Sequence, residues 1–462
     1  MPIITEPHVY APLSEVCDAM QTLLTTSADA LAQSTGFIQR QRKLTGSSFA
    51  QMLTFGWLDN PEASYEQLVQ MGAAVGVELS AQALEQRFTP KSAEFLKALL
   101  EESVGLMLQA EPVSLELLSR FAGELLSRFA GVYLLDSSII TLPAELASLW
   151  PACGGSTDKH PKAALKLQVG YDIQNGMLQL SLESGRTQDK ASPMHTQTLP
   201  KGTLRLADLG YFSLPQMGQM TQDDVFWLSR VQSGCVVYTQ EGERYDLMSF
   251  LRAHAPNAHP GDTLEVPIFL GAEAKLPCRL MIQRVPKEVE QVRRRRVKDY
   301  ARKKGVTPTK QTKFLTGWTL LVTNAPPEKL TLEDALVLLR VRWQIELLFK
   351  LWKQHGRIDE WRSQKPWRIL TEVYAKLVAM VLQHWIFLVG VWHYPDRSLV
   401  KASLVVRQHA TSLACAFAEH GTQALQKAVR ILRRCLSVGT RLNKRKKKPS
   451  TYQTIIMAEG EH

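Results

Sequence analysis

The stretch Val132-Tyr-Leu-Leu-Asp136 is an apolar run that ends in a carboxylate and continues as Ser-Ser-Ile-Ile to residue 140. Its composition predicts a buried β-strand. A second run, Thr203-Leu-Arg-Leu-Ala-Asp208, ends in the same way. An aspartate that closes a buried strand is hard to solvate and is disfavoured by β-propensity. Either aspartate alone could simply cap a turn, but the two together suggest a shared site.

The pattern around these runs predicts a mixed α/β domain. Residues 165–171 and 177–182 alternate at period two, and Asn175-Gly176 between them is a strong hairpin signal. We then expect a short helix near 190–198, the strand ending at Asp208, a helix near 213–221 and a strand at 225–229. Three antiparallel strands followed by alternating helix and strand is the ribonuclease-H-like order, in which the first strand brings Asp136 to the sheet centre and the fourth brings Asp208 beside it.

A third carboxylate lies in Arg342-Trp-Gln-Ile-Glu346-Leu-Leu-Phe-Lys350-Leu-Trp-Lys353. At about 100° per residue, Arg342, Glu346 and Lys353 share one face of a helix that is otherwise largely apolar. One interpretation is a set of intrahelical ion pairs, with Glu346 between Arg342 and Lys350. The other is that Asp136, Asp208 and Glu346, in that order, form the carboxylate set of a two-metal phosphoryl-transfer site, whose oxygen ligands suit Mg²⁺.

These motifs resemble the DDE transposases of bacterial insertion sequences, in particular the group with a Tyr-x2-Arg-x3-Glu-x6-Lys signature. Arg342, Glu346 and Lys353 match the last three positions, and Leu339 stands where the signature has tyrosine. The resemblance extends to the sequences around Asp136 and Asp208, to Val322-Thr-Asn324 and to the basic C-terminal tail. It spans most of residues 35–455.

The resemblance implies a catalytic set and a reaction. Asp136 would bridge two Mg²⁺ ions, for which Mn²⁺ would substitute, while Asp208 and Glu346 would each complete one ion. Arg342, Lys350 and Lys353 would contact DNA phosphates near the cut. The enzyme would cleave double-stranded DNA at the terminal inverted repeats of its element and join the 3′-hydroxyls to target DNA, acting as a homodimer that holds two ends.

Positive charge is concentrated in two runs. The net charge is +11; residues 293–304 carry a net +7 and residues 441–448 a net +6, which leaves −2 for the remainder. Such runs indicate a polyanion partner, most simply nucleic acid, although a solubilising loop or tail has the same composition. The DNA-binding candidates in these runs are Arg293, Arg294, Arg295, Arg296, Lys444, Arg445 and Lys446.

The N-terminal part is predicted to be helical. Residues 64–71, a glycine-containing turn and residues 80–88, capped by Ser80, are compatible with a helix-turn-helix. Gln82, Gln86 and Arg87 would then be possible groove contacts. An ordinary pair of antiparallel helices fits the same pattern; the resemblance, which places terminal-repeat binding here, favours DNA.

The expected domain layout follows from these assignments. Residues 1–130 would form a helical DNA-end-binding domain, and residues 131–231 with 331–365 a ribonuclease-H-like catalytic core. Residues 232–330 would be a β-rich insertion that carries the first basic run in a loop or helical turn. Residues 366–462 would be a helical C-terminal region with a basic tail.

Several classes of protein are disfavoured. No Walker A or GxGxxG motif is present, which argues against a nucleotide cofactor. No secretory signal is apparent, and the six cysteines show no metal or disulfide spacing, so we expect a bacterial cytoplasmic protein associated with the nucleoid. The apolar stretch 377–392 is too short to span a bilayer and predicts a buried core helix rather than a membrane segment.

Four alternatives share these features. A ribonuclease-H-like nuclease would hydrolyse DNA without joining it. A catalytically decayed copy, suggested by Leu339, would bind DNA only, and so would a regulator that uses the helical N-terminus and the basic runs. A structural protein would use the three carboxylates as surface caps and keep them far apart.

Overall fold

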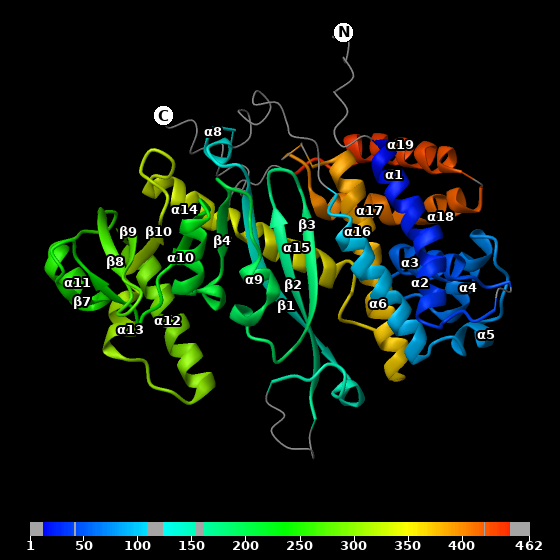
Figure 1. The fold of residues 1–462 in the computed structure, drawn as a ribbon, viewed down its shortest axis with the longest axis horizontal. Coiled ribbons are helices and arrows are strands. Elements are labelled where there is room, and N and C mark those ends of the chain that lie inside the picture. The colour runs from blue at the N-terminus through cyan, green and yellow to red at the C-terminus, as the bar shows by residue number, and fades with distance from the viewer. Residues whose placement is uncertain are drawn as a thin grey trace, which may run out of the picture. The chain divides into compact units, whose positions relative to one another are not determined.

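In the computed structural model the chain forms two compact units, and the structure describes residues 13–40, 43–108, 123–153, 161–392, 394, 396–419 and 421–443 (Figure 1). The helical unit comprises residues 1–123, 137–187 and 344–462. The sheet unit comprises residues 124–136 and 188–343. Asp136 and Asp208 therefore belong to the sheet unit, and Glu346 and Lys353 to the helical unit.

Three parallel strands carry the two aspartates of the sheet unit. β1 (Val132–Leu142) pairs with β4 (Leu204–Ala207), and β4 pairs with β5 (Phe226–Arg230). The residues that precede Asp136 are apolar and buried, as expected for a central strand. Those that precede Asp208 are buried except for the half-buried Ala207, and one of them, Arg205, is charged. β1 continues beyond Asp136 into the helical unit, where β2 is its neighbour. Between the strands lie a turn at Asp189–Ala191, α9 (Pro193–Thr196), a turn at Leu209–Tyr211 and α10 (Leu214–Gln222).

The expected helix near 190–198 is replaced by two short pieces. Pro193 starts α9, and the Ser192 side chain caps it by accepting from the backbone N–H of Met194. Proline is favoured in the first turn of a helix, so the chain restarts here instead of continuing one helix from Asp189. The helix near 213–221 and the strand near 225–229 are confirmed by α10 and β5.

The strand-rich segment 232–330 extends the same sheet. β10 (Trp318–Thr323) pairs antiparallel with β5, and the order continues β10-β9-β8-β6-β7. Trp227 of β5, Trp318 of β10 and Ile268 of β8 share one buried cluster. The segment therefore has no separate core. Its remaining elements are β6 (Val236–Tyr238), β7 (Arg244–Asp246), α11 (Leu247–His254), β8 (Thr263–Leu270), β9 (Leu276–Arg284), α12 (Lys287–Lys304) and α13 (Lys310–Leu315), followed by α14 (Leu332–Val341).

The helical unit is built around one long helix, α16 (Pro366–Gly390), which packs against α6, α3 and α19 (Figure 1). By length and composition α16 could cross a membrane, but its apolar window is entirely buried in the structure. It is the expected core helix, although it starts eleven residues earlier than the apolar stretch. The other elements of this unit are α1 (Leu13–Thr22), a π-helical turn (Leu23–Ser27), α2 (Ala28–Ser34), α3 (Gly46–Asp59), α4 (Tyr65–Ala74), α5 (Ala81–Glu85), α6 (Pro90–Gly105), β2 (Ala163–Asp172), β3 (Leu178–Ser184), α15 (Trp343–Gln354), α17 (Leu399–Gln408), α18 (Ala410–Ala418) and α19 (Thr422–Gly439).

Helices from the two ends of the chain pack together in this unit. α1 contacts α19, α3 contacts α18, and both α3 and α6 contact α16. We expected residues 1–130 and residues 366–462 as separate regions; their described helices instead share one core. Large apolar side chains such as Phe49, Phe55 and Trp57 on α3 need partners on several sides, and the C-terminal helices provide them.

The hairpin signal at Asn175-Gly176 is confirmed. β2 and β3 are antiparallel, and Gly176 adopts a left-handed backbone with φ of 73°. The Gly176 carbonyl accepts a 2.7 Å hydrogen bond from Nε2 of His384 on α16. The turn is thereby attached to the core helix, which fixes the β2–β3 pair within the unit.

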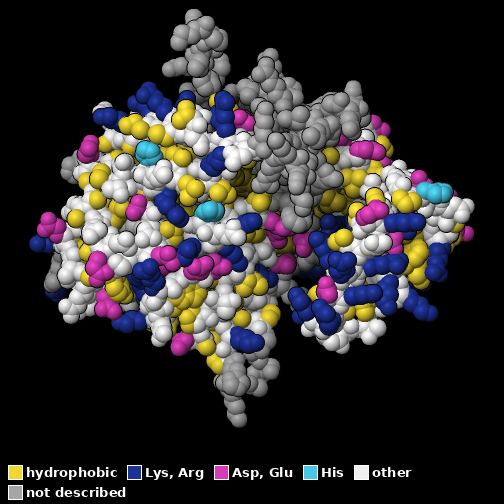
Figure 2. All heavy atoms as spheres, turned by 180° about the vertical axis from the view of Figure 1, so that it is seen from behind, with side chains coloured by type: hydrophobic (Ala, Val, Ile, Leu, Met, Phe, Trp, Pro, Cys, Tyr) yellow, Lys and Arg dark blue, Asp and Glu magenta, His cyan; other side chains and the backbone are white. Residues whose placement is uncertain are grey.

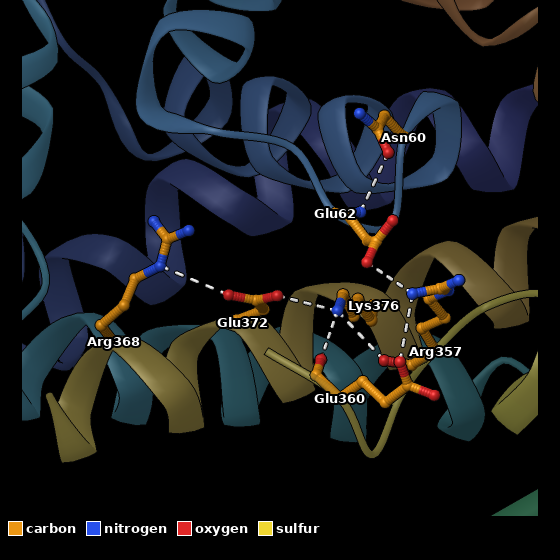
Figure 3. A network of polar contacts seen from close by, with 7 residues as sticks. All are labelled: Asn60, Glu62, Arg357, Glu360, Arg368, Glu372 and Lys376. Carbon is orange, nitrogen blue, oxygen red and sulfur yellow. Dashed lines mark hydrogen bonds and ion pairs between the residues drawn. The ribbon is translucent and has the colours of Figure 1, made fainter. Parts of the chain in front are cut away.

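A buried ion network ties α16 to the segments around it (Figure 3). Glu372 bridges Arg368 and Lys376 at 3.4 and 2.7 Å, and all three side chains are buried. Lys376 Nζ also donates to the carbonyls of Arg357 and Glu360. Burial of these charges is tolerated because each one is paired and hydrogen-bonded.

Candidate active site

Asp136 and Asp208 occupy matching positions on neighbouring strands. β1 and β4 are parallel, with Leu134 opposite Leu206 and Leu135 opposite Ala207, and each aspartate is the next residue. Neighbouring strands lie about 4.8 Å apart, and residues in register point to the same side of a sheet. The two carboxylates are therefore held side by side at the point where β4 ends, as the strand pattern predicts.

Arg342 contacts the first of these carboxylates. Its Nη1 lies 3.3 Å from Oδ2 of Asp136, and the two side chains are only 10% and 18% exposed. Arg342 occupies the single-residue turn between α14 and α15, where its backbone N–H still donates to the Leu338 carbonyl. We expected Arg342 to share a continuous helix with Glu346 and Lys353, but α15 begins at Trp343.

The remaining motif residues lie on α15. Glu346 is half-buried in the first turn of the helix, where the positive end of the helix dipole favours a carboxylate. Lys353 is in the last turn; its Nζ donates to the Ile139 carbonyl of β1 at 2.9 Å and lies 3.7 Å from Asp359. Lys350 is exposed. Lys353 thus contacts the same strand that carries Asp136, three residues further on.

A buried arginine that sequence reasoning missed lies three residues before Asp208. Arg205 Nη1 donates to the His195 carbonyl, and Nη2 lies 2.7 Å from His195 Nδ1. Because a guanidinium can only donate, Nδ1 accepts and the proton sits on Nε2. Burial and the adjacent guanidinium lower the pKa of His195 to about 4, while burial lowers the pKa of Arg205 to about 10. Both side chains and Asp208 line one small cavity.

Asp189 lies against the turn that follows Asp208. A Cβ added to Gly210 would come within 2.5 Å of Asp189 Oδ2, so the carboxylate touches the backbone of the Leu209–Tyr211 turn. Only glycine permits this approach. Among the other acidic residues of the sheet unit, Asp189 is the one whose position can support Asp208.

The first basic run forms the 18-residue helix α12, not a loop (Figure 1). Figure 2 shows Lys and Arg side chains gathered on the right-hand lobe of its view. Glu288 and Glu290 lie in its first turn and basic residues in its last, as the helix dipole favours. Arg293 points inward and donates to the Trp318 carbonyl and to Thr319 Oγ1. Burial and the neighbouring Arg230 and Arg296 lower its pKa.

The four arginines of the run thus have different surroundings. Arg293 holds α12 against β10, and Arg294 pairs with Glu290 of the same helix. Arg295 and Arg296 are exposed on the surface. The second run cannot be placed in the same way, because Lys444, Arg445 and Lys446 lie outside the described residues.

The proposed groove-contact segment forms a helix, a turn and a shorter helix. Ser64 caps α4, and Gly76, with φ of 84°, makes the turn. Ser80 caps α5, which ends at Glu85 after five residues. Gln82, Gln86 and Arg87 are all exposed. The second helix is shorter than expected because Gln86 already closes it, and α6 starts at Pro90.

The donor set of the sheet unit consists of two carboxylates, whose oxygens are the ligands preferred by Mg²⁺ and Mn²⁺. Among the residues that the structure describes, no three His, Cys, Asp or Glu side chains are grouped closely enough to hold a metal ion. The carboxylates of Asp136 and Asp208 suit a divalent ion in their chemistry.

Comparisons with known proteins identify the family. Residues 127–382 match the family model described as "Transposase DDE domain". The chain is 31% identical to the transposase for insertion sequence element IS231B of Bacillus thuringiensis subsp. berliner, covering 77% of this chain and 75% of the relative. It is 30% identical to the IS231C transposase of the same organism, over 92% and 90% of the two chains, and 26% identical to the IS1151 transposase of Clostridium perfringens, over 76% of each. The chain therefore belongs to the DDE transposases of insertion sequences.

Proposed function

We propose that this transposase acts by cut-and-paste, cleaving DNA at the ends of its element and joining the 3′-hydroxyls to target DNA. Asp136, Asp208 and Glu346 would hold two Mg²⁺ ions. The observation that carries the proposal is the matched register of β1 and β4, which aligns Asp136 with Asp208 beside Arg342. Asp136 lies within β1 at the level where β4 ends, and Asp208 directly follows β4. Neither carboxylate offers an apolar packing surface, and a metal site would account for both.

Each residue has a role in this scheme. Two divalent ions would supply charge neutralisation at phosphorus, an activated oxygen and a stabilised leaving oxygen. The carboxylates of Asp136, Asp208 and Glu346 would hold these ions. Arg342 contacts the Asp136 carboxylate and would orient it, and its guanidinium would also be able to bind a phosphate. Lys353, anchored on β1 through Ile139, and Lys350 would bind phosphates near the cut.

The topology supports a ribonuclease-H-like catalytic core as part of the proposal. The strand order β3-β2-β1-β4-β5, with β1, β4 and β5 parallel and β2 antiparallel to β3, is compatible with such a core. Residues 232–330 would be the insertion that contacts the DNA end through α12. The α4–α5 segment, with Gln82, Gln86 and Arg87, would contact the terminal repeats, and two copies would pair two ends.

The test uses pre-cleaved element ends, a supercoiled target plasmid, and Mg²⁺ or Mn²⁺. Wild-type protein should join ends to target. Asp136→Ala and Asp208→Ala should each abolish joining and cleavage while end binding persists. Robust cleavage by either variant with Mg²⁺ would remove the metal assignment. Hydrolysis without any joined product would favour the rival function, a nuclease without strand transfer.

A further inference from the structure

α19 presents a basic face that none of the motifs above includes. Residues 422–443 contain five Lys or Arg and no Asp or Glu. Lys427, Arg430 and Arg434 are exposed, and at about 100° per residue they fall within a 60° sector of the helix. We name these three residues the α19 stripe. Because they project to one side, they form a single positive surface.

The opposite side of α19 is fixed in the core. Leu425, Val429, Leu432 and Leu436 are fully buried, and they lie on the face away from the stripe. α19 contacts α1, α16, α17 and α18. The orientation of the helix is therefore set by packing, and the stripe is held outward by the same contacts.

The stripe has no acidic partner among the described residues. None of its three side chains makes a hydrogen bond or an ion pair with them, in contrast to Arg294 of α12, which pairs with Glu290. Three exposed cations on one face create a local positive potential, which attracts a polyanion at low and moderate salt.

The spacing fits a nucleic-acid backbone. A rise of 1.5 Å per residue places the three cations over about 10 Å. Duplex DNA presents about six phosphate charges over that length. We propose that the α19 stripe binds the phosphate backbone of double-stranded DNA without reading its sequence, adding a contact surface in the helical unit that is distinct from α12 and from the carboxylates. This inference rests on the proposed function, in which DNA is the substrate.

Duplex DNA is favoured over an anionic membrane surface. Membrane-surface helices insert an apolar face, and the apolar face of α19 is buried inside the protein. Ile431 and Val438 are exposed beside the stripe, at 45% and 81%, but two aliphatic side chains give little insertion energy.

The test measures binding of full-length protein to a 30-bp duplex without element ends, in EDTA, from 50 to 200 mM NaCl. The test variant is Lys427→Gln, Arg430→Gln and Arg434→Gln together; glutamine keeps helix propensity. Log K falls as log [salt] rises, and the loss of three phosphate contacts should make this slope shallower by about 2.7. Between 50 and 200 mM NaCl, the fold-decrease in affinity should therefore be about 40 times smaller for the variant than for wild type.

Two controls define the result. Arg244→Gln, Arg252→Gln and Lys275→Gln together remove the same charge from β7, α11 and the β8–β9 turn and should leave most of the slope. Lys427→Arg, Arg430→Lys and Arg434→Lys together keep the charges and should restore wild-type binding. Equal slopes for wild type and the stripe variant, or an equal loss in the Arg244 control, would overturn the inference.

The remaining outcomes separate this inference from the function itself. A wild-type protein that binds and cleaves a duplex carrying element ends, with a stripe variant of unchanged salt slope, would reject only the α19 surface. A wild-type protein that binds neither duplex would reject the proposed function first. Stripe-dependent binding to vesicles of phosphatidylglycerol, with unchanged DNA binding, would assign the surface to membranes and overturn the inference.

Discussion

Arg342 Nη1 lies 3.3 Å from Asp136 Oδ2, so a cation from the α14–α15 junction holds the carboxylate that ends the buried part of β1. The contact is longer than a strong charge-assisted hydrogen bond. The arrangement suggests that the arginine keeps the carboxylate ionised and oriented before the metal binds.

Replacing Arg342 should therefore affect both metal use and DNA cleavage. Arg342→Gln should lower the cleavage rate by about 10- to 100-fold, the usual effect of losing a group that orients a metal ligand. It should also raise the Mg²⁺ concentration needed for half-maximal cleavage. Arg342→Lys keeps the charge, so its cleavage rate and Mg²⁺ requirement should lie between those of wild type and Arg342→Gln. Unchanged Mg²⁺ titrations for Arg342→Gln would show that the ion pair has no part in metal binding.

Leu339 can be tested by restoring the signature residue. It is half-buried on α14, three residues before Arg342. If leucine in place of the signature tyrosine only weakens the positioning of the DNA end, Leu339→Tyr should increase end cleavage. Binding to unrelated DNA should not change. Leu339→Phe, which lacks the hydroxyl, is the matched control. An inactive wild type that stays inactive as Leu339→Tyr would instead identify a decayed copy.

Stability should fall on acidification because of His384. Burial lowers its pKa to about 4. The unfolded chain takes up this proton below about pH 6.5, whereas the folded chain does so only near pH 4, so stability is complete above pH 6.5 and is lost as the pH falls towards 4. The loss should reach about 3 kcal/mol. His384→Gln can still donate a hydrogen bond to the Gly176 carbonyl but does not titrate. In this variant the free energy of unfolding, measured with urea, should depend less on pH between about 6.5 and 4.

Gly176 is predicted to be intolerant of alanine. An added Cβ would lie 2.4 Å from Leu388 Cδ2 and 2.8 Å from the Trp392 ring, at a φ of 73°. Strain and overpacking together should cost about 2–4 kcal/mol. Gly76→Ala is the matched control, because Gly76 also has a positive φ but no atom within 4 Å of the added Cβ. It should lose only about 1–2 kcal/mol in urea unfolding.

The buried network on α16 should respond asymmetrically to single and double substitutions. Glu372→Gln leaves Arg368 and Lys376 as two buried cations without their shared anion and should destabilise the protein by about 3–5 kcal/mol. Adding Lys376→Met removes one of these two unpaired cations and should recover part of the loss. Additive effects in a double-mutant cycle would indicate that the two residues are not coupled.

Local patterns in the sequence predicted most of the strands. The limits of β4 and β5 agree with expectation to within one residue, and the Asn175-Gly176 turn was recognisable because a hairpin depends on two residues. The matched register of the residues before Asp136 and Asp208 agrees with the neighbouring strands expected for β1 and β4, although β1 continues six residues beyond Asp136. These features depend on residues that are close together in the chain, so they can be predicted from a single sequence.

Features that depend on distant contacts were not predictable. Arg293 and Arg295 are indistinguishable in a run of four arginines, yet Arg293 is taken up by Trp318 and Thr319, 25 and 26 residues away. The sequence around Arg205 does not indicate its contact with His195, because the two residues are brought together only by the fold. The shared core of the N- and C-terminal helices likewise requires contacts across several hundred residues.

The continuous pairing of β5 with β10 also constrains how this protein can be shortened. If residues 232–330 were deleted, one side of β5 would lose its hydrogen-bonding partner and become a bare edge next to the strand that leads to Asp208. Unprotected edges recruit strands from other molecules. A trimmed enzyme of this kind is therefore expected to aggregate, unless a designed cap replaces the missing strand.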